Sequence, residues 1–436
     1  MNILDDIKLD KDQIEAIKEE NNTIIIAGAG SGKTTTLTGK IKYLVDTKKV
    51  DPNKIIMISF TNKATNELID RINIKYKIPV LITTFHKLSL KIIKKQYHPN
   101  IVRNQETIVS LILEANKKVL KKHTPDKLTK EVVNEITLSL NKYKEFKSTP
   151  NFLIEFVYTK YQQYLKENNL IDFVDMIKIA TKVLKTNKCV DIDYLIIDEY
   201  QDISNIRFEF IKAIHEATNC KIIVVGDDWQ SIFAFAGSNI NLFYEFEKTF
   251  KAKKKFIRNT YRNSQELIDV ASNFIMKNKN QIPKKLISNK TLKQPILIKY
   301  YYKNIVKATI KTIDHILKEK PSPEILLLGR YTFDINPFLE SKHFIYNKQL
   351  KYKTLPLTFL TIHSAKGLGF DCVIIINGDD KKYGFPAKKA DIEEERRLFY
   401  VALTRTKNKV YIVSNRFFPS VFVKEIRKDK NVRILH

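Results

Sequence analysis

A candidate phosphate-binding loop lies close to the start of the chain. Residues 28–35 read GAGSGKTT, in which Gly32, Lys33 and Thr34 match the end of the phosphate-loop motif GxxxxGK[ST], while Ala27 stands at the position of its first glycine. Glycines let backbone N–H groups close around phosphate oxygens at the start of a helix. We expect Lys33 to reach the β- and γ-phosphates of a nucleotide and the Thr34 hydroxyl to ligate Mg²⁺.

A second acidic site at the end of a strand is needed to hold the metal. The run YLIIDE at 194–199 ends an apolar stretch with two carboxylates. Asp198 would hold Mg²⁺, and Glu199 would activate the attacking water as general base. Such a run is common by chance, but together with the loop at 28–35 it predicts a site that binds and hydrolyses ATP.

A third stretch combines a polar side chain with two aromatic ones. The sequence GDDWQSIFAFAGS at 226–238 follows an apolar run and places Gln230, Phe233 and Phe235 close together. Two interpretations are open at this point. The stretch is either a loop that packs back onto a core or an element that contacts two different ligands.

The elements that must position these residues are short apolar runs rich in Ile and Val. Runs that are apolar on both faces, separated by helical periodicity, are typical of buried parallel strands, so the predicted fold class is α/β. The runs lie at 23–28, 54–60, 194–199, 221–227, 295–302, 324–330, 356–363, 371–378 and 409–415.

The same runs predict the domain organisation. We expect a first α/β domain from residues 1–86 and 190–255, and a second from 256–436. Residues 87–189 hold no strand-like run, have heptad-like spacing of Leu, Ile and Val, and predict a helical insertion in the first domain. The run KAKKK at 251–255 is interpreted as a linker.

The composition indicates a polyanionic partner. The 436 residues include 76 Lys and Arg against 48 Asp and Glu, a net charge of +28, and 43% are hydrophobic. This excess favours nucleic acid as partner, with the lysine bias of an AT-rich genome as the alternative. Cys189, Cys220 and Cys372 are far apart and predict neither a disulfide nor a zinc site. No signal peptide or membrane-spanning run is recognisable, so a soluble cytoplasmic protein is expected.

Eight runs stand out along the chain, in the order AGAGSGKTTTL, ISFTNKATNEL, TTFHKL, LIIDEYQD, GDDWQSIFAFAGS, NTYRNSQEL, LTIHSAKGL and EEERRLFYVALTRTK. Their wording and order resemble the motifs of superfamily 1A DNA helicases of the UvrD/Rep type, and the resemblance covers nearly the whole chain. GDDWQSI, IDFVDM (171–176) and PSVFVKEI (419–426) are similar to the DNA helicase IV branch.

The resemblance implies two RecA-like P-loop NTPase domains with ATP in the cleft between them. It implies an ATP-dependent DNA helicase or single-stranded DNA translocase that moves 3′ to 5′ as a monomer. Its substrates would be single-stranded and tailed double-stranded DNA. It would lie with the nucleoid in a bacterium, and a viral or phage origin is also open.

The resemblance also assigns roles on the nucleotide side. Gln13 would read the adenine edge and Tyr261 would stack on the adenine. Arg262 and Arg405 would reach the γ-phosphate as arginine fingers, and Gln230 would touch the same group. The remaining loop residues expected around the phosphates are Ala29, Gly30, Ser31, Gly32, Lys33, Thr34 and Thr35.

On the DNA side, the resemblance implies aromatic rings that stack on bases and polar groups that contact the backbone or bases. With these roles the stretch at 226–238 would join the two ligands. The residues are Phe60, Thr61, Asn62, Thr84, His86, Phe233, Phe235 and His363.

The chain departs from the family pattern in four places. Gly369 stands where UvrD and Rep have a glutamate that contacts the ribose. Ala234 replaces a frequent arginine, and Phe235 replaces a common tryptophan. About 25 residues separate LLLGR from TFLTIH, where relatives insert a second accessory domain. We therefore expect a motor that lacks most of that domain.

Three alternative functions stay open from the sequence. A DNA-stimulated ATPase could remodel nucleoprotein without productive unwinding. An RNA helicase is a second alternative, because recognition of the 2′-OH is not readable from sequence. The third, a nucleic-acid-binding protein with an inactive nucleotide site, is disfavoured by the intact Lys33, Thr34, Asp198 and Glu199.

Overall fold

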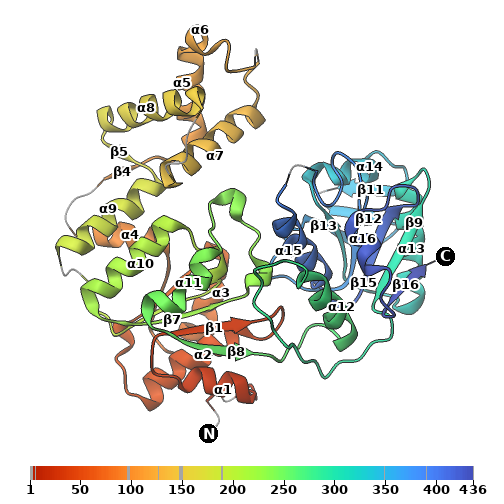
Figure 1. Ribbon diagram of the computed structural model, residues 1–436, viewed down its shortest axis with the longest axis horizontal. Helices are drawn as coiled ribbons and strands as arrows, with labels where there is room; N and C mark the ends of the chain where they lie inside the picture. Colours follow the sequence, from red (N-terminus) through yellow and green to blue (C-terminus); the bar gives the residue numbers. More distant parts are fainter. Residues whose placement is uncertain are drawn as a thin grey trace.

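The computed structural model has two α/β units and a helical segment that projects from the first (Figure 1). Within the described residues, no helix is both long and apolar enough to cross a membrane. The described residues are 3, 4, 6–95, 99–125, 127–146, 151–187, 190–347, 349–388 and 390–435.

The first unit is built on a six-stranded parallel sheet in the order β3-β2-β6-β7-β1-β8, counted over the described residues. Strands β1, β2 and β7 are buried almost throughout, as expected for strands with helices on both faces. The strands are β1 Thr23–Ala27, β2 Ile55–Ser59, β3 Leu81–Thr84, β6 Tyr194–Ile197, β7 Lys221–Gly226 and β8 Lys253–Ile257.

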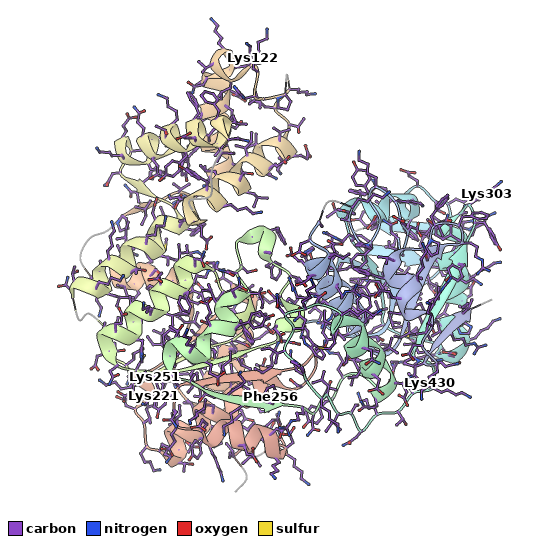
Figure 2. All side chains as sticks on the ribbon, in the orientation of Figure 1. Lys122, Lys221, Lys251, Phe256, Lys303 and Lys430 are labelled. Carbon is purple, nitrogen blue, oxygen red and sulfur yellow. The ribbon has the colours of Figure 1, made fainter. Side chains whose placement is uncertain are left out.

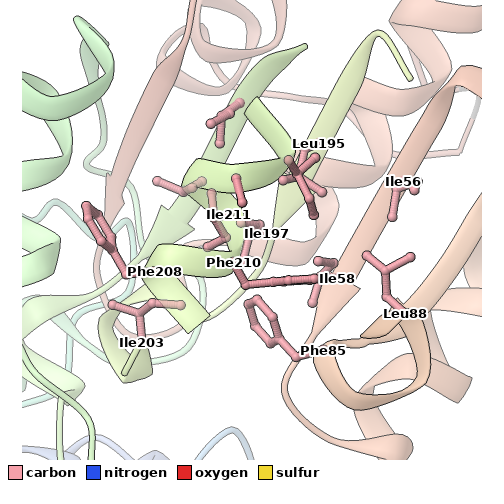
Figure 3. Packing of buried hydrophobic residues seen from close by; sticks show 14 of the residues in the cluster. Ile56, Ile58, Phe85, Leu88, Leu195, Ile197, Ile203, Phe208, Phe210 and Ile211 are labelled. Atoms are coloured by element: carbon pink, nitrogen blue, oxygen red, sulfur yellow. The ribbon is translucent and has the colours of Figure 1, made fainter. Parts of the chain in front are cut away.

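Two hydrophobic clusters hold this sheet, one on each face. Figure 3 shows part of the larger one, where Phe210 and Phe85 pack against Ile58 and Ile197. The rings of Phe85 and Phe210 meet edge to face with centroids 6.4 Å apart. The helices of the unit are α1 Lys11–Lys18, α2 Lys33–Lys42, α3 Asn62–Ile69, α4 Phe85–Ile93, α9 Phe173–Thr186, α10 Asn205–Thr218 and α11 Asn241–Phe250.

The projecting segment has a hydrophobic cluster of its own, which runs from Val102 to Leu165. Two short strands, β4 and β5, pair in parallel at its base, with Asn100 opposite Leu170 and Ile101 opposite Ile171. Its elements are β4 Asn100–Ile101, α5 Gln105–Ala115, α6 Lys117–Leu120, α7 Lys130–Phe146, α8 Phe152–Glu167 and β5 Leu170–Ile171.

The second unit has an eight-stranded sheet in the order β11-β12-β13-β10-β14-β15-β9-β16, counted over the described residues. Its strands run parallel except in the antiparallel pairs that β12 makes with β11 and β13. The strands are β9 Ile296–Tyr301, β10 Ile325–Gly329, β11 Phe344–Asn347, β12 Gln349–Tyr352, β13 Leu355–Thr361, β14 Phe370–Ile375, β15 Thr406–Asn415 and β16 Val432–Leu435.

One cluster of the second unit reaches into the stretch that sequence analysis singled out. Trp229 and Ile232 are fully buried in it together with α12 and α15. The chain after β7 thus leaves the first sheet and packs on the second unit. The helices here are α12 Gln265–Ile275, α13 Ile305–Glu319, α14 Asn336–Leu339, α15 Ile392–Leu403 and α16 Val421–Ile426.

The structure confirms the predicted α/β class and corrects one interpretation. The run KAKKK is no linker, because Lys253–Ile257 forms β8 and pairs with β1. An edge strand tolerates lysines that would be excluded from a central one. The expected domain limit at residue 255 therefore falls inside a strand.

The limits of the helical insertion also need a narrower definition. Helix α9 and most of α4 fall within the predicted insertion at 87–189, yet both helices pack in the core of the first sheet. Its predicted end at residue 189 lies outside the described residues. We propose that the accessory domain comprises about residues 100–171, the segment between the strands of the β4–β5 pair.

Candidate functional site

The carboxyl ends of the first sheet bring the expected site residues together. β1 leads into the loop at 28–35, β6 into Asp198 and Glu199, and β7 into Gln230. Because the strands are parallel, these ends meet at one edge, where ligands of open α/β sheets bind. A cavity of about 1030 Å³ opens there and is lined by residues of both units.

The glycine-rich loop has the geometry of a phosphate cradle. Gly30 and Gly32 have φ values of +71° and +80°, which glycine adopts without steric cost. A Cβ atom on Gly30 would lie 2.5 Å from the Cβ of Arg262, so the close approach of the two units requires glycine. Within the described structure, the buried Ser31 hydroxyl has no hydrogen-bond partner. These features fit a bound triphosphate, which would supply acceptors at this loop.

Lys33 forms an ion pair with Glu199 at 3.1 Å between Nζ and Oε1. Burial alone would raise the pKa of Glu199, but the charges of Lys33 and Lys366 outweigh it and lower that pKa. For the neighbouring Asp198, burial and the Glu199 charge raise the pKa. Glu199 also has a φ of +50°, a strained value of the kind found at functional sites.

Arg405 reaches this cavity from the second unit. Its guanidinium donates to the Leu368 carbonyl at 3.3 Å and to Gln230 Oε1 at 3.1 Å, and the side chain is 1% exposed. Burial, followed by the charge of Arg262, lowers the pKa of Arg405 to about 9. Arg262 donates to the carbonyls of Gly367 and Thr404 at 3.1 and 3.4 Å. An anion between the two guanidiniums would relieve their mutual repulsion.

The amide of Gln230 has a defined orientation. Its Nε2 donates to Asp227, which is fully buried and accepts hydrogen bonds when ionised. The oxygen therefore faces Arg405. In this arrangement Gln230 holds Arg405, and the expected contact with a γ-phosphate would run through that guanidinium.

A buried lysine supports this orientation. The ammonium of Lys284 contacts Asp227 and lies 2.6 Å from Asp228, and its side chain is only 2% exposed. It also stands over the Trp229 ring at 4.6 Å. Lys284, Asp227, Gln230 and Arg405 thus form a continuous polar chain between the two units.

Replacing Lys284 by methionine is expected to lower the unfolding free energy by about 3 kcal/mol or more, because an uncompensated buried charge costs that much. The measurement is the midpoint of thermal or urea unfolding. The control is Lys285→Met, which changes the neighbouring lysine, whose side chain is exposed. Equal midpoints for the two variants would contradict a structural role for the buried pair.

The segment between β13 and β14 connects the two ends of the cavity. Lys366 donates to Asp202 at 2.5 Å and to the Gln230 carbonyl at 2.8 Å, and its ammonium lies 5.0 Å from the centre of the Phe233 ring. The carbonyls that follow it accept from Arg262 and Arg405. One short segment therefore contacts both the arginines and an aromatic ring.

At its other end the cavity is aromatic. Phe233, Phe235 and His363 contact one another, with ring centroids 5.1 to 6.0 Å apart. Phe235 is 44% exposed. Phe60 and Arg207 also line the cavity, and the Arg207 guanidinium lies 5.2 Å from the centre of the half-buried Phe60 ring. Exposed rings next to cations suit stacking on nucleic-acid bases.

Two family profiles match the sequence. The profile of the UvrD/REP helicase N-terminal domain matches residues 9–251, more than half of the chain. The chain belongs to the UvrD/Rep helicase family. The profile of the UvrD-like helicase C-terminal domain matches residues 356–413. The family recognised from the eight motifs is thereby confirmed.

Individual relatives of this UvrD/Rep family member are helicases by name. ATP-dependent DNA helicase Rep of Buchnera aphidicola subsp. Acyrthosiphon pisum (strain APS) is 35% identical over 301 residues, 63% of this chain and 46% of that protein. The Rep protein of Buchnera aphidicola subsp. Schizaphis graminum (strain Sg) is 28% identical over 445 residues, 94% and 66% of the two chains. DNA helicase IV of Escherichia coli (strain K12) is 26% identical over 490 residues, which cover 96% of this chain and 69% of that protein. The chain thus spans roughly half to two thirds of the length of these relatives.

Most of the expected site residues of this UvrD/Rep family member line the one cavity, but six do not. Ala29 is a buried residue of the loop, Asn62 is the exposed first residue of α3, and Phe235 is next to lining residues but is not one of them. The other three are Gln13, Thr84 and His86.

These three have structural partners of their own. Gln13 is 2% exposed, and its Nε2 donates to the Ser31 carbonyl at 3.4 Å. Thr84 is buried and caps α4. His86 packs on Phe173 with ring centroids 5.0 Å apart, and burial followed by the Arg207 charge lowers its pKa to about 4. Thr61 does line the cavity, and it also caps α3.

Sequence reasoning missed several charged residues in or next to the site, among them Asp202, Arg207, Lys284 and Lys366. Two of them stand inside motifs that were recognised, Asp202 in LIIDEYQD and Lys366 in LTIHSAKGL. Arg207 and Lys284 do not belong to a recognisable motif. The fold alone brings Arg207 to the cavity and Lys284 to Asp227.

The segment in which most of a second accessory domain was expected to be missing forms a small structure. Between β10 and β13 the described residues form a short turn, α14 and the β11–β12 hairpin. The hairpin extends the same sheet by two strands. A Cβ atom on Gly369 would lie 3.2 Å from Arg262 Nε, so a side chain at this position would press on that guanidinium.

Proposed function

We propose that this UvrD/Rep family member hydrolyses ATP to move along single-stranded DNA in the 3′ to 5′ direction and to unwind tailed duplexes. The observation that carries the proposal is that one cavity of about 1030 Å³ is lined by both kinds of residue. The triphosphate loop and two arginines line one part of it, and Phe60, Phe233 and His363 line another. A change at the bound nucleotide would be transmitted to the bound DNA through the segments that line both parts of the cavity.

ATP would bind between the two units. Lys33 and the backbone of residues 29–35 would hold the phosphates, while Tyr261, half exposed at the rim, would offer its ring to the adenine. Thr34 and Asp198 are the residues that would hold Mg²⁺, which neutralises phosphate charge when bound. Arg262 and Arg405 would stabilise the charge that develops on the γ-phosphoryl oxygens.

Glu199 is the proposed general base. Its carboxylate now pairs with Lys33 and accepts from Gln201. Phosphate oxygens compete for the Lys33 ammonium, so nucleotide binding would remove a charge that lowers the pKa of Glu199. The carboxylate would then be free to accept a proton from water.

On the DNA side, Phe60, Phe233, Phe235 and His363 would stack on bases. The stretch at 226–238 would then connect the nucleotide to the DNA, with its link to the nucleotide made through Arg405. Its polar part holds Arg405 through Gln230, and its aromatic part faces DNA. Opening and closing of the cleft would shift the two groups of rings relative to each other. We further propose a monomer that works beside DNA in the cytoplasm.

Steady-state ATP hydrolysis without nucleic acid, with single-stranded DNA and with RNA tests the proposal. Stimulation by DNA and not by RNA is expected. Stimulation by RNA alone would identify an RNA helicase instead. No stimulation would contradict the coupling of ATP hydrolysis to DNA binding that is assigned to residues 226–238.

A DNA-stimulated ATPase that remodels nucleoprotein is the second candidate. It is favoured by the small hairpin that stands where relatives carry an accessory domain. Unwinding of a 3′-tailed duplex separates the two functions. Translocation without strand separation at saturating ATP would support the second candidate.

DNA binding is expected to weaken steeply with salt. Neutralising about six phosphates would cost roughly 1000-fold in affinity between about 50 and 200 mM salt. The measurement is the Kd for oligo-dT over that range. Lys122, Lys303 and Lys430 lie far apart at the edge of the molecule in the view of Figure 2, so only part of the +28 charge lies along the proposed DNA path. A flat salt dependence would contradict the role given to that charge.

A further inference from the structure

A buried lysine joins the helical segment to the first unit. Lys144 lies in the last turn of α7, and its side chain is almost completely buried. Its ammonium lies 2.7 Å from Asp172 Oδ2 and 2.6 Å from Asp175 Oδ2, both at the start of α9. The ammonium also lies 5.7 Å from the centre of the buried Tyr161 ring of α8. We call Lys144, Asp172 and Asp175 the α7 latch.

The latch fixes one arrangement of α7 and α9. Asp172 caps α9 and accepts the backbone N–H of Asp175 at 2.9 Å, so both carboxylates belong to the start of this helix. Lys178 of α9 donates to the Lys144 carbonyl at 2.6 Å. A displacement of α7 would leave buried charges unpaired, which is costly. The helical segment, which stands above α9 and α10 in Figure 1, therefore has a charged attachment in addition to the β4–β5 pair.

Aromatic contacts lead from the latch to the part of the cavity where DNA is proposed to bind. Phe173, the residue after Asp172, packs on His86 with ring centroids 5.0 Å apart. Phe85, the neighbour of His86 in the chain, meets Phe60 edge to face at 5.4 Å. Phe60 lines the cavity. A displacement of α9 would therefore reach a ring that is proposed to stack on a base.

A second route begins at the next residue of α7. Burial raises the pKa of Glu145, while a hydrogen bond with Ser204 and the charge of Arg207 lower it, so this carboxylate lies close to the start of α10. The Arg207 guanidinium lies 5.2 Å from the centre of the Phe60 ring and 5.7 Å from that of Phe85. Two adjacent residues of α7 thus reach the same pair of rings, one through α9 and the other through α10.

We propose that Lys144 is a positioning residue for DNA binding, which holds Phe60 in place through α9 and couples the position of the helical segment to the affinity for single-stranded DNA. The proposal rests on the proposed function. Lys144 does not line the cavity, so its effect would act through Phe60. A lysine that only stabilises the fold would leave the contribution of Phe60 to DNA binding unchanged.

The test is a double-mutant cycle on the affinity for oligo-dT. The latch variant carries Lys144→Met, Asp172→Asn and Asp175→Asn, which leaves no buried charge unpaired and keeps a good N-cap on α9. The latch variant and Phe60→Ala are each expected to weaken binding about fivefold or more, as loss of one base-stacking contact would. Together they should weaken binding no more than about twofold beyond Phe60→Ala alone, because the latch acts through that ring. Lys142→Met changes an exposed lysine of α7 and should bind like the wild type.

Losses that multiply in the combined variant would overturn the proposal, because they would mean that the latch and Phe60 act independently. Wild-type affinity in the latch variant would also overturn it, as would an equal loss in Lys142→Met. ATP hydrolysis without DNA should stay at the wild-type rate, since no latch residue lines the cavity.

Hydrogen exchange on the wild type tests the same coupling without any substitution. Because coupling between sites is reciprocal, bound oligo-dT should slow amide exchange in the last turn of α7 and at the start of α9. Protection confined to the residues that line the cavity would overturn the proposal. If DNA fails to stimulate ATP hydrolysis by the wild type, the proposed function itself fails. A stimulated wild type with multiplying losses removes the role of Lys144 alone.

Discussion

Replacing Arg405 by alanine is expected to lower kcat for DNA-stimulated ATP hydrolysis by about 1000-fold, the lower end of what an arginine finger contributes. The guanidinium is held at the cavity by Gln230 and the Leu368 carbonyl, and its pKa of about 9 keeps it charged at neutral pH. Alanine removes the charge and one of the contacts between the two units, the hydrogen bond to Gln230. The measurement is steady-state hydrolysis at saturating ATP and DNA.

Two further variants make this result interpretable. Arg405→Lys keeps a positive charge but loses the planar fork, so its kcat should fall between those of the wild type and alanine. Arg416→Ala removes an exposed arginine of the same unit and should leave kcat unchanged. A fluorescent ATP analogue checks that nucleotide still binds. A decrease below tenfold in a folded Arg405→Ala protein would contradict a role in the transition state.

Replacing Lys33 by alanine is expected to reduce ATP hydrolysis by at least about 100-fold, since it removes a donor that meets the phosphates. The substitution also leaves Glu199 without its partner at 3.1 Å, next to the buried carboxyl of Asp198. Binding of single-stranded DNA without nucleotide should persist, because Lys33 lies in the phosphate loop.

The paired measurements for this variant are ATP turnover and DNA affinity. Lys11→Ala, on the exposed face of α1, is the control. Turnover close to that of the wild type would mean that residues 28–35 do not hold the triphosphate. Loss of DNA binding together with turnover would indicate a folding defect, which the unfolding midpoint would show.

The strands that carry the site were predictable because both of their faces are buried. TIIIA, YLII and KIIVVG are continuous apolar runs, and each is a central strand of the first sheet. Strand β8 was not predictable in the same way. Its sequence KKKFI has its lysines at a sheet edge, where water solvates them, so no apolar pattern arises.

The site residues also differ in whether the sequence could predict them, because some depend on local structure and others on tertiary structure. The phosphate loop and the Asp198–Glu199 pair depend on local backbone geometry, so a short motif describes them. Lys284 depends on tertiary structure. It is one of 76 basic residues, and only the packing of the chain after α12 against Asp227 and Trp229 distinguishes it. The orientation of the Gln230 amide likewise follows from its neighbours.

The pairing of β4 with β5 makes the helical segment an exchangeable module. Its two junctions are direct partners, with Ile101 opposite Ile171, so the chain leaves and rejoins the first unit at almost the same point. The segment also keeps its own hydrophobic cluster. Removing it would therefore require only a short loop to close the gap, and a different domain could be grafted there. Lineages could vary this segment without rebuilding the motor beneath it.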